Sequence, residues 1–311
     1  MVFALHGWAS SGYDFLLGME EGKPDFVPES GPLAATTTTP IGIPLASFYQ
    51  EFAADGRVTV YLGSGIERWY ATLPSNFFQM LESADAELKL GLSHLVYLPG
   101  QREIQFQDRL GIRYVLDFGD ERDDFIAALK DYEIVFYGGH SRYGRGPAFR
   151  EFWNYFRMGT VFPSIEMDAL SPYFLNEPIL QTTQYPVKFA MVDGASYRYQ
   201  YRGETDESSY LPADAYTKVI EGNAKDLRAA AFLKGRQLFF FHSCSNIQYW
   251  KDPFRARFPR PQEKLVFGTT QPSHGDLRAE VALITALVRR FSSSSQALAE
   301  LNAVEPIFTV Y

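Results

Sequence analysis

Short runs of apolar residues alternate along this chain with segments in which apolar residues recur every three to four positions. The strongest runs cover residues 58–62, 134–137, 238–241 and 264–268. They are bounded by Gly, Pro or polar residues and rich in β-branched or aromatic side chains, which predicts strands. The helical spacing covers residues 75–90, 120–132 and 277–288. Strands that alternate with helices and are apolar on both faces are typical of an α/β fold with a mostly parallel central sheet.

The remaining segments show weaker patterns. Further strands are predicted over residues 95–98, 112–116 and 189–192, and further helices over residues 149–156 and 213–234. Gly, Pro and Thr cluster in residues 1–56, which predicts an irregular N-terminal segment packed on the domain. Residues 293–311 follow a short polar break and are predicted to form a C-terminal tail.

The composition argues against several classes of protein. Apolar residues make up 46% of the 311 residues and charged residues 21%, as in an ordinary globular protein. The net charge is −8 without a Lys/Arg block, so no nucleic-acid partner is expected. No apolar stretch approaches the ~20 residues that cross a bilayer, so no membrane partner is expected. Aromatic residues make up 16%, which we interpret mainly as core, with an aromatic-lined groove as the alternative.

The counts of cysteine and histidine also narrow the chemistry. The chain holds one cysteine and begins without the pattern of a secretory signal, which fits a reducing cytoplasm. Its five histidines form no HExxH pattern and no CxxC pair is present, so no metal site and no cofactor are expected.

Cys244 and His140 occupy corresponding positions after two of the strongest apolar runs. His140 follows residues 134–137 and two glycines, and Cys244 follows residues 238–241. Both are therefore predicted to lie past the carboxyl ends of parallel strands, on one edge of the sheet, where ligands bind. A thiol needs a nearby base or cation to become the nucleophilic thiolate. The alternatives are a buried, inert cysteine and a solvated loop histidine.

The chain shows one pattern made of three parts. An apolar strand ends in Gly-His, a later apolar strand ends in Ser-Cys, and a third strand with a helix after it follows. The matching pieces are residues 134–140, 238–245, 265–270 and 277–288. The pattern resembles the caspase-like cysteine peptidases, which include caspases, metacaspases, gingipains, legumains and separases. The resemblance covers roughly residues 57–290 and implies a three-layer α/β/α sandwich over residues 57–292. It also implies an insertion around residues 150–210, because His140 and Cys244 are 104 positions apart.

The resemblance implies a cysteine endopeptidase that cleaves a protein or peptide. Cys244 would attack the carbonyl to form an acyl-enzyme, and His140 would act as base and then as acid. Backbone N–H groups of Ser141 and Cys244 would bind the oxyanion. The residues expected to bind substrate are Gly139, Arg142, Arg145, His242 and Ser243. Relatives that cut after Arg or Lys often carry Asp two positions before the cysteine, where this chain has His242.

Several alternatives stay open. Arg142 and Arg145 would bind a carboxylate of the substrate or would be solvated loop charges. The acidic group Asp117, Asp120, Asp123 and Asp124 would recognise a basic residue or would reflect the charge preference of a helix N-terminus. The chain as a whole could be a non-catalytic caspase-like protein that binds a peptide or partner, or an unrelated α/β enzyme with a buried cysteine. An oligomer or a protein partner is compatible with each reading.

Overall fold

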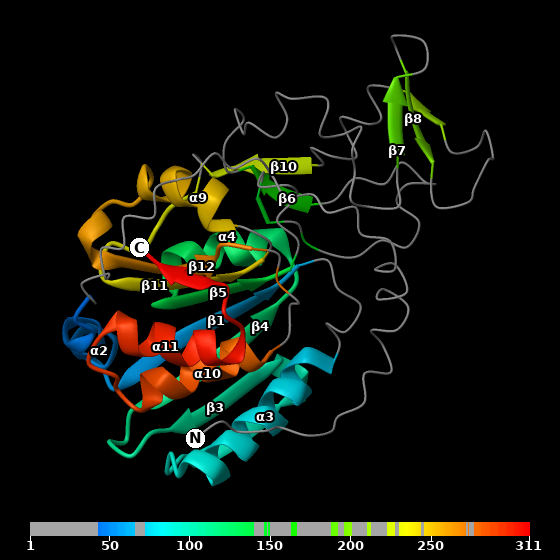
Figure 1. Cartoon of the computed structure of the whole chain (residues 1–311). Helices are drawn as coiled ribbons and strands as arrows, with labels where there is room; N and C mark the ends of the chain where they lie inside the picture. The colour runs from blue at the N-terminus through cyan, green and yellow to red at the C-terminus, as the bar shows by residue number, and fades with distance from the viewer. Residues whose placement is uncertain are drawn as a thin grey trace.

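The computed structural model describes residues 43–65, 72–139, 146–147, 149, 163–166, 188–191, 196–200, 210–212, 223–227, 230–243, 246–271, 273 and 277–311. Within these ranges, eight strands form one mixed sheet. They are β1 (Arg57–Ser64), β2 (Ser93–Leu98), β3 (Glu103–Gln107), β4 (Arg113–Gly119), β5 (Ile134–Gly138), β11 (Gln237–His242), β12 (Lys264–Thr269) and β13 (Phe308–Val310). Their order is β13-β12-β11-β5-β1-β4-β3-β2, and the strands from β12 to β4 run parallel (Figure 1).

Helices lie on both faces of this sheet (Figure 1). The helices on one face are α2 (Ala46–Phe52), α3 (Leu73–Leu88), α10 (Arg278–Val288) and α11 (Ser294–Val304). Those on the other are α4 (Arg122–Asp131) and α9 (Asn246–Arg255). The side chains of β11 alternate between the two faces, because Phe240 joins the cluster that holds Leu283 of α10, whereas Phe241 packs against Trp250 of α9. A strand buried on both faces reads in the sequence as an unbroken apolar run.

Two smaller sheets and two short 3₁₀ helices complete the described elements. Strand β6 (Pro163–Glu166) pairs in parallel with β10 (Asn223–Asp226). Strands β7 (Lys188–Met191), β8 (Ser196–Gln200) and β9 (Tyr210–Pro212) form an antiparallel sheet. The 3₁₀ helices are η2 (Pro99–Gln101) and η5 (Pro261–Glu263). In the described part of residues 150–210, where an insertion is implied, no strand joins the eight-stranded sheet.

Most predicted elements of the main sheet are confirmed. The four strongest apolar runs are β1, β5, β11 and β12, and the three strongest helical patterns are α3, α4 and α10. The weaker strand patterns also correspond to β2, β4 and β7. The largest fully buried side chains in the described ranges are aromatic: Trp250, Tyr137, Phe48, Phe77, Phe106, Phe125, Phe136, Phe149, Phe239, Phe240 and Phe241. The high aromatic content therefore fills the core to a large extent.

One predicted helix is wrong where its residues are described. The pattern over residues 213–234 predicts a helix, but residues 223–226 form β10 and residues 230–234 are irregular. Ala, Lys and Leu in this segment are good helix formers, but tertiary contacts routinely override helix propensity, and here residues 223–226 pair with β6. Of the helix predicted from Phe149, Phe152, Trp153 and Phe156, only Phe149 is a described residue; it is buried in the core and belongs to no described helix.

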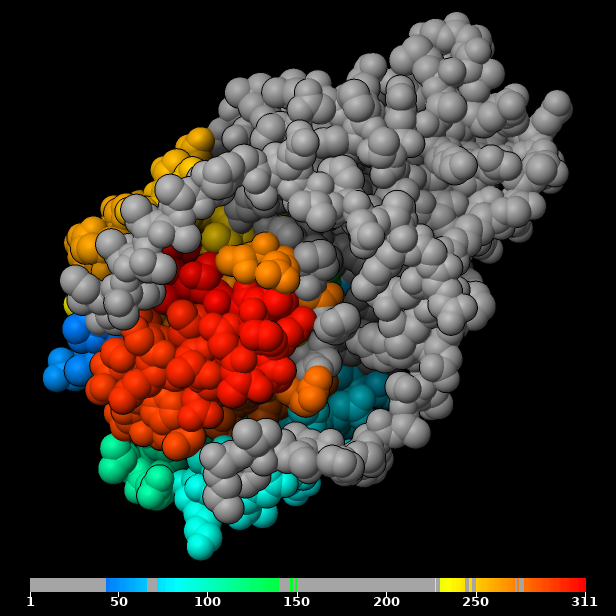
Figure 2. Space-filling model, viewed as in Figure 1, coloured from blue at the N-terminus to red at the C-terminus, as the bar shows by residue number. Residues whose placement is uncertain are grey.

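Both ends of the described chain are more ordered than the sequence indicates. Residues 293–311 are not a tail, because they contain α11 and then β13, which pairs antiparallel with β12. Figure 2 shows α11 at the surface beside α10, on the face that also carries α2 and α3. Within the predicted irregular segment, residues 46–52 form α2, which buries Phe48 and Phe52 in the core. The domain therefore extends beyond residues 57–292 at both ends.

Candidate functional site

The carboxyl ends of β1, β5 and β11 meet at one edge of the sheet. Gly138 of β5 is aligned with Ser64 of β1 on one side and with His242 of β11 on the other. The N–H of Gly65 donates to the Gly138 carbonyl at 2.6 Å, and the N–H of Gly139 donates to the His242 carbonyl at 3.2 Å. The two strands whose ends precede His140 and Cys244 are therefore direct neighbours.

Gly139 is where these backbones come closest. Its φ is +151°, which side-chain-bearing residues rarely adopt. A Cβ there would lie 2.7 Å from the Gly65 Cα and 3.0 Å from the Tyr137 hydroxyl. Only glycine fits this position without moving the backbone of the neighbouring strand end.

The predicted dyad itself lies outside the described residues. This holds for His140 and Cys244, and also for Ser141, Arg142 and Arg145. The chain is described up to Gly139 on one side and up to Ser243 on the other, so the geometry of the site comes from the residues that border the dyad.

Ser243 is held by a buried polar network from two other elements. The Asn246 amide, at the start of α9, donates to the carbonyls of Ser243 at 2.7 Å and of Phe241 at 2.8 Å. The Thr269 hydroxyl, at the end of β12, donates to the same Ser243 carbonyl. The exposed fraction of Ser243, Asn246 and Thr269 is 1% or less. Buried polar groups satisfied in this way fix one local arrangement of the backbone.

His242 forms a second buried polar group on the opposite face. Its Nδ1 lies 2.9 Å from Glu280 Oε1 of α10, and its Nε2 lies 3.1 Å from Glu305 Oε2 after α11. Burial by itself lowers the pKa of the ring, but the two carboxylates outweigh it and raise the pKa to about 10. His242 is thus a cation at neutral pH, and it ties the end of β11 to both C-terminal helices.

Two residues expected to bind substrate point into the protein instead. The His242 ring is fully buried with both ring nitrogens bound to carboxylates, and the Ser243 side chain is buried beside Asn246. Direct contact of either side chain with a substrate does not fit this geometry. Burial follows because every position of β11 is covered by helices on both faces, including its last residue. For Gly139, the N–H is used within the sheet.

Some of these partners carried a sequence signal that was missed. Glu280 is in line with Ile284 and Leu287 on the apolar stripe of α10, and a carboxylate in such a stripe indicates a buried partner. Asn246 stands two residues after Cys244 as a polar residue at a helix start. Thr269 and Glu305 have no comparable local signal, because their partners are distant in the chain.

The acidic group near α4 makes ordinary local pairs. Asp120 lies 3.3 Å from the Arg102 guanidinium, and Asp123 lies 2.9 Å from that of Arg122. The Tyr132 hydroxyl donates to Asp117 at 2.8 Å. Burial raises the pKa of Asp117, the bond from Tyr132 lowers it, and the facing Glu103 raises it further. These contacts favour a structural reading of the acidic group.

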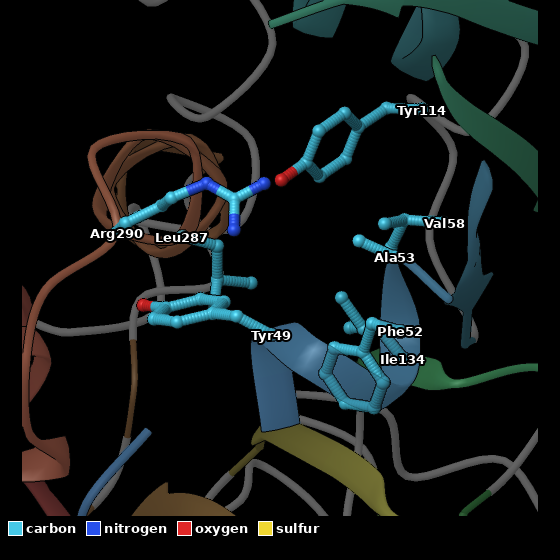
Figure 3. Close-up of a pocket in the computed structure, with 8 residues that line it drawn as sticks. All are labelled: Tyr49, Phe52, Ala53, Val58, Tyr114, Ile134, Leu287 and Arg290. Carbon is cyan, nitrogen blue, oxygen red and sulfur yellow. The ribbon is translucent and has the colours of Figure 1, made fainter. Parts of the chain in front are cut away.

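A small cavity lies at the amino ends of the central strands, opposite the carboxyl ends that carry the candidate site (Figure 3). Its lining includes Val58, Tyr114 and Ile134, at the amino ends of β1, β4 and β5, and Arg290 points into it. The cavity volume is about 10 Å³, far below the roughly 300–1,000 Å³ of typical ligand sites. It is therefore not a substrate site for the predicted chemistry.

The described ranges show neither a metal-ligand cluster nor a membrane-spanning helix. No group of three or more His, Cys, Asp or Glu side chains there is arranged to hold a metal ion. None of the helices described is both long and apolar enough to span a membrane. Comparisons with protein-family models, with curated proteins and with solved structures found no match to this chain.

Proposed function

We propose that this chain is a cysteine endopeptidase with Cys244 as nucleophile and His140 as general base, on a three-layer α/β/α sandwich of the caspase-like kind. One observation carries the proposal: Gly138 and His242 are aligned on neighbouring parallel strands. His140 and Cys244 each come two residues after these aligned positions. Because neighbouring strands are only about 4.8 Å apart, the chain leads into His140 and into Cys244 from two strand ends that lie side by side.

The elements around the two strands support the same reading. Strand β12 and helix α10 follow β11 in the chain, as the third strand and helix of the resemblance require. Helices on both faces of the sheet support the three-layer architecture. Helix α9 begins at Asn246, two residues after Cys244. The positive end of a helix dipole stabilises a nearby thiolate, so this helix start favours an activated Cys244.

In the proposed reaction, His140 removes the proton of the Cys244 thiol and the sulfur attacks the peptide carbonyl carbon. The carbonyl π bond becomes an oxyanion, which the N–H groups of Ser141 and Cys244 bind. The oxyanion then collapses, the C–N bond breaks, and His140 gives its proton to the leaving amine. Water, deprotonated by His140, hydrolyses the thioester and restores the thiol. No cofactor takes part in these steps.

The proposed substrate is a protein or peptide in a cytoplasmic setting, where a single free thiol stays reduced. Arg142 and Arg145 follow His140 directly in the chain and are proposed to bind a carboxylate of the substrate. The buried His242 replaces the acidic residue that basic-specific relatives carry, which argues against a preference for Arg or Lys at the cleaved bond.

A peptide library with a fluorogenic leaving group, and a peptidyl acyloxymethyl ketone as covalent probe, test the proposal. Wild-type protein should cleave members of the library and gain the mass of one probe at Cys244. Cys244→Ala should abolish both signals, and His140→Ala should reduce them at least about 100-fold, the usual contribution of a general base. Cleavage that survives in Cys244→Ala would refute the proposal.

The alternative is a non-catalytic caspase-like protein that binds a peptide or partner at the same edge. The buried His242 in place of an acidic residue is the observation that favours it. Saturable binding of a library peptide without cleavage or covalent labelling would support this alternative over the peptidase.

A further inference from the structure

The carbonyl group of Ser243 receives hydrogen bonds from two different elements. The Asn246 amide of α9 donates to it at 2.7 Å, and the Thr269 hydroxyl of β12 donates to it as well. All three residues are buried. This carbonyl belongs to the peptide group whose N–H is that of Cys244, so its partners act one bond away from the proposed nucleophile.

Asn246 is itself held in one orientation. Its Oδ1 accepts a hydrogen bond from the Thr269 N–H at 3.3 Å, while its Nδ2 faces the carbonyls of Phe241 and Ser243. Gly268 makes room for the amide, because a Cβ there would overlap Asn246 Oδ1 and would lie 2.8 Å from Ile247. Reversing the amide would set its oxygen against two carbonyls, so the network fixes the donor side toward Ser243.

Asn246 does not serve as an ordinary helix cap. A capping side chain accepts hydrogen bonds from the first N–H groups of its own helix. The Asn246 oxygen instead accepts from Thr269 on a neighbouring strand, and its NH₂ group donates back to the end of β11. Its contacts therefore tie the end of β11 to the start of α9, the two elements that flank Cys244 in the chain.

We infer that Asn246 and Thr269 are positioning residues that orient the Ser243–Cys244 peptide group for oxyanion binding. In a planar trans peptide the C=O and the N–H point in opposite directions. Because Asn246 and Thr269 hold the Ser243 carbonyl, the N–H of the same peptide group is directed away from these two residues. Oxyanion stabilisation depends on donors that are oriented before the reaction. The inference rests on the proposed function of Cys244.

Two reactions of the single cysteine separate this role from a general structural one. Iodoacetamide alkylates the thiolate by displacement of iodide and forms no oxyanion. Acylation by p-nitrophenyl acetate passes through a tetrahedral oxyanion and releases p-nitrophenolate. Both rates are measured against pH on the full-length protein, with Cys244→Ala as the background. A correctly oriented N–H speeds the second reaction and leaves the first unaffected.

Thr269→Val keeps the shape of the side chain and removes the hydroxyl that donates to Ser243. We expect acylation of Thr269→Val to slow about 10- to 100-fold, somewhat less than the loss of a complete oxyanion donor, while alkylation keeps its wild-type rate and pH profile. Thr269→Ser retains the hydroxyl and should restore acylation. Thr285→Val is the matched control, because its buried hydroxyl donates to the Ala282 carbonyl within α10, and it should change neither rate. If Thr269→Val does not fold, Asn246→Ala takes its place, after circular dichroism has shown that this variant is folded.

The outcomes distinguish the two proposals. An ordinary thiol pH profile in wild-type protein that His140→Ala leaves unchanged would overturn the proposed function, and this inference with it. A shifted profile that His140→Ala abolishes, combined with unchanged acylation in Thr269→Val, would overturn the inference alone. Equal slowing of both reactions in Thr269→Val would also overturn it, since this would indicate that the substitution displaces Cys244 itself.

Discussion

The buried charge of His242 predicts how the stability of this protein depends on pH. The ring is fully buried between Glu280 and Glu305, and these carboxylates raise its pKa from 6.5 to about 10. A raised pKa means that the folded state holds a proton that the unfolded state releases. The stabilisation is therefore complete below pH 6.5, falls as the pH rises, and is lost above about pH 10.

The magnitude follows from the same two values. A rise from 6.5 to about 10 corresponds to about 5 kcal/mol at about 1.4 kcal/mol per pH unit. At pH 7 about 4 kcal/mol of this remains, because the unfolded ring is already mostly neutral, and at pH 9 about 1 kcal/mol remains. His242→Gln removes the cation and leaves two buried carboxylates. We expect it to lower the free energy of unfolding by about 3–5 kcal/mol at pH 7, as for other broken buried pairs.

Urea denaturation between pH 6.5 and 9.5 measures the effect. The difference in unfolding free energy between wild-type protein and His242→Gln should shrink by about 3 kcal/mol from pH 7 to pH 9. Burial lowers the pKa of Lys264 to about 8, so this residue also makes the stability depend on pH. Its contribution is the same in both proteins and cancels in the difference. Burial of the charged Lys264 costs stability at low pH, and this cost disappears as the pH rises from about 8 to 10.5. The Lys264 contribution therefore raises stability with pH, whereas the His242 contribution lowers it. Burial raises the pKa of Tyr49 and Tyr114 in the folded state, so stability also falls once the unfolded tyrosines ionise near pH 10. The measurements therefore stop at pH 9.5.

His94→Asn is the matched control, because His94 is exposed on the edge strand β2 with a φ of +54°, which Asn tolerates. It should leave both the stability and its pH dependence unchanged. Parallel pH profiles for wild-type protein and His242→Gln would show that the ring does not carry a charge in the folded state, and the reasoning would be refuted.

Two further substitutions test the packing at the edges of the sheet. Gly139→Ala sets a Cβ 2.7 Å from the Gly65 Cα, and we expect it to lower the free energy of unfolding by about 1–3 kcal/mol in urea denaturation. The loss should exceed that of Gly56→Ala, because Gly56 also has a positive φ but has open space around it. Equal losses would argue against the close approach at Gly139. Asn302 bonds both the N–H and the carbonyl of Phe308, at 2.9 and 3.1 Å, so Asn302→Ala should cost about 1 kcal/mol or more. An unchanged urea midpoint in Asn302→Ala would show that solvent replaces these bonds without loss.

The strands that frame the site were the most predictable part of the fold. Burial of β5 and β11 on both faces demands apolar residues at nearly every position, and this demand is visible in a single sequence. Strand β3 escaped prediction because Glu103–Gln107 alternates apolar residues with Glu and Gln over only five positions. Its pairing with β4, rather than local preference, makes it a strand.

The C-terminal segment shows a different kind of failure. Residues 293–311 follow a polar break and begin with serines, which predicts a tail even though Ala297, Leu301 and Val304 recur at helical spacing. In the fold, Leu301 and Phe308 are buried, and β13 completes the sheet beside β12. A three-residue strand has too little pattern to be recognised, and it exists because β12 offers a free edge for pairing.

Residue type and chain order were enough to indicate two buried strands, one followed by an imidazole and the other by a thiol. The surroundings of those strand ends depended on contacts that no local window contains. His242 reads as a substrate contact beside Cys244, yet its partners Glu280 and Glu305 are 38 and 63 positions away. Local preferences act over a few residues, whereas the state of a buried ring depends on which distant groups the packed helices bring to it.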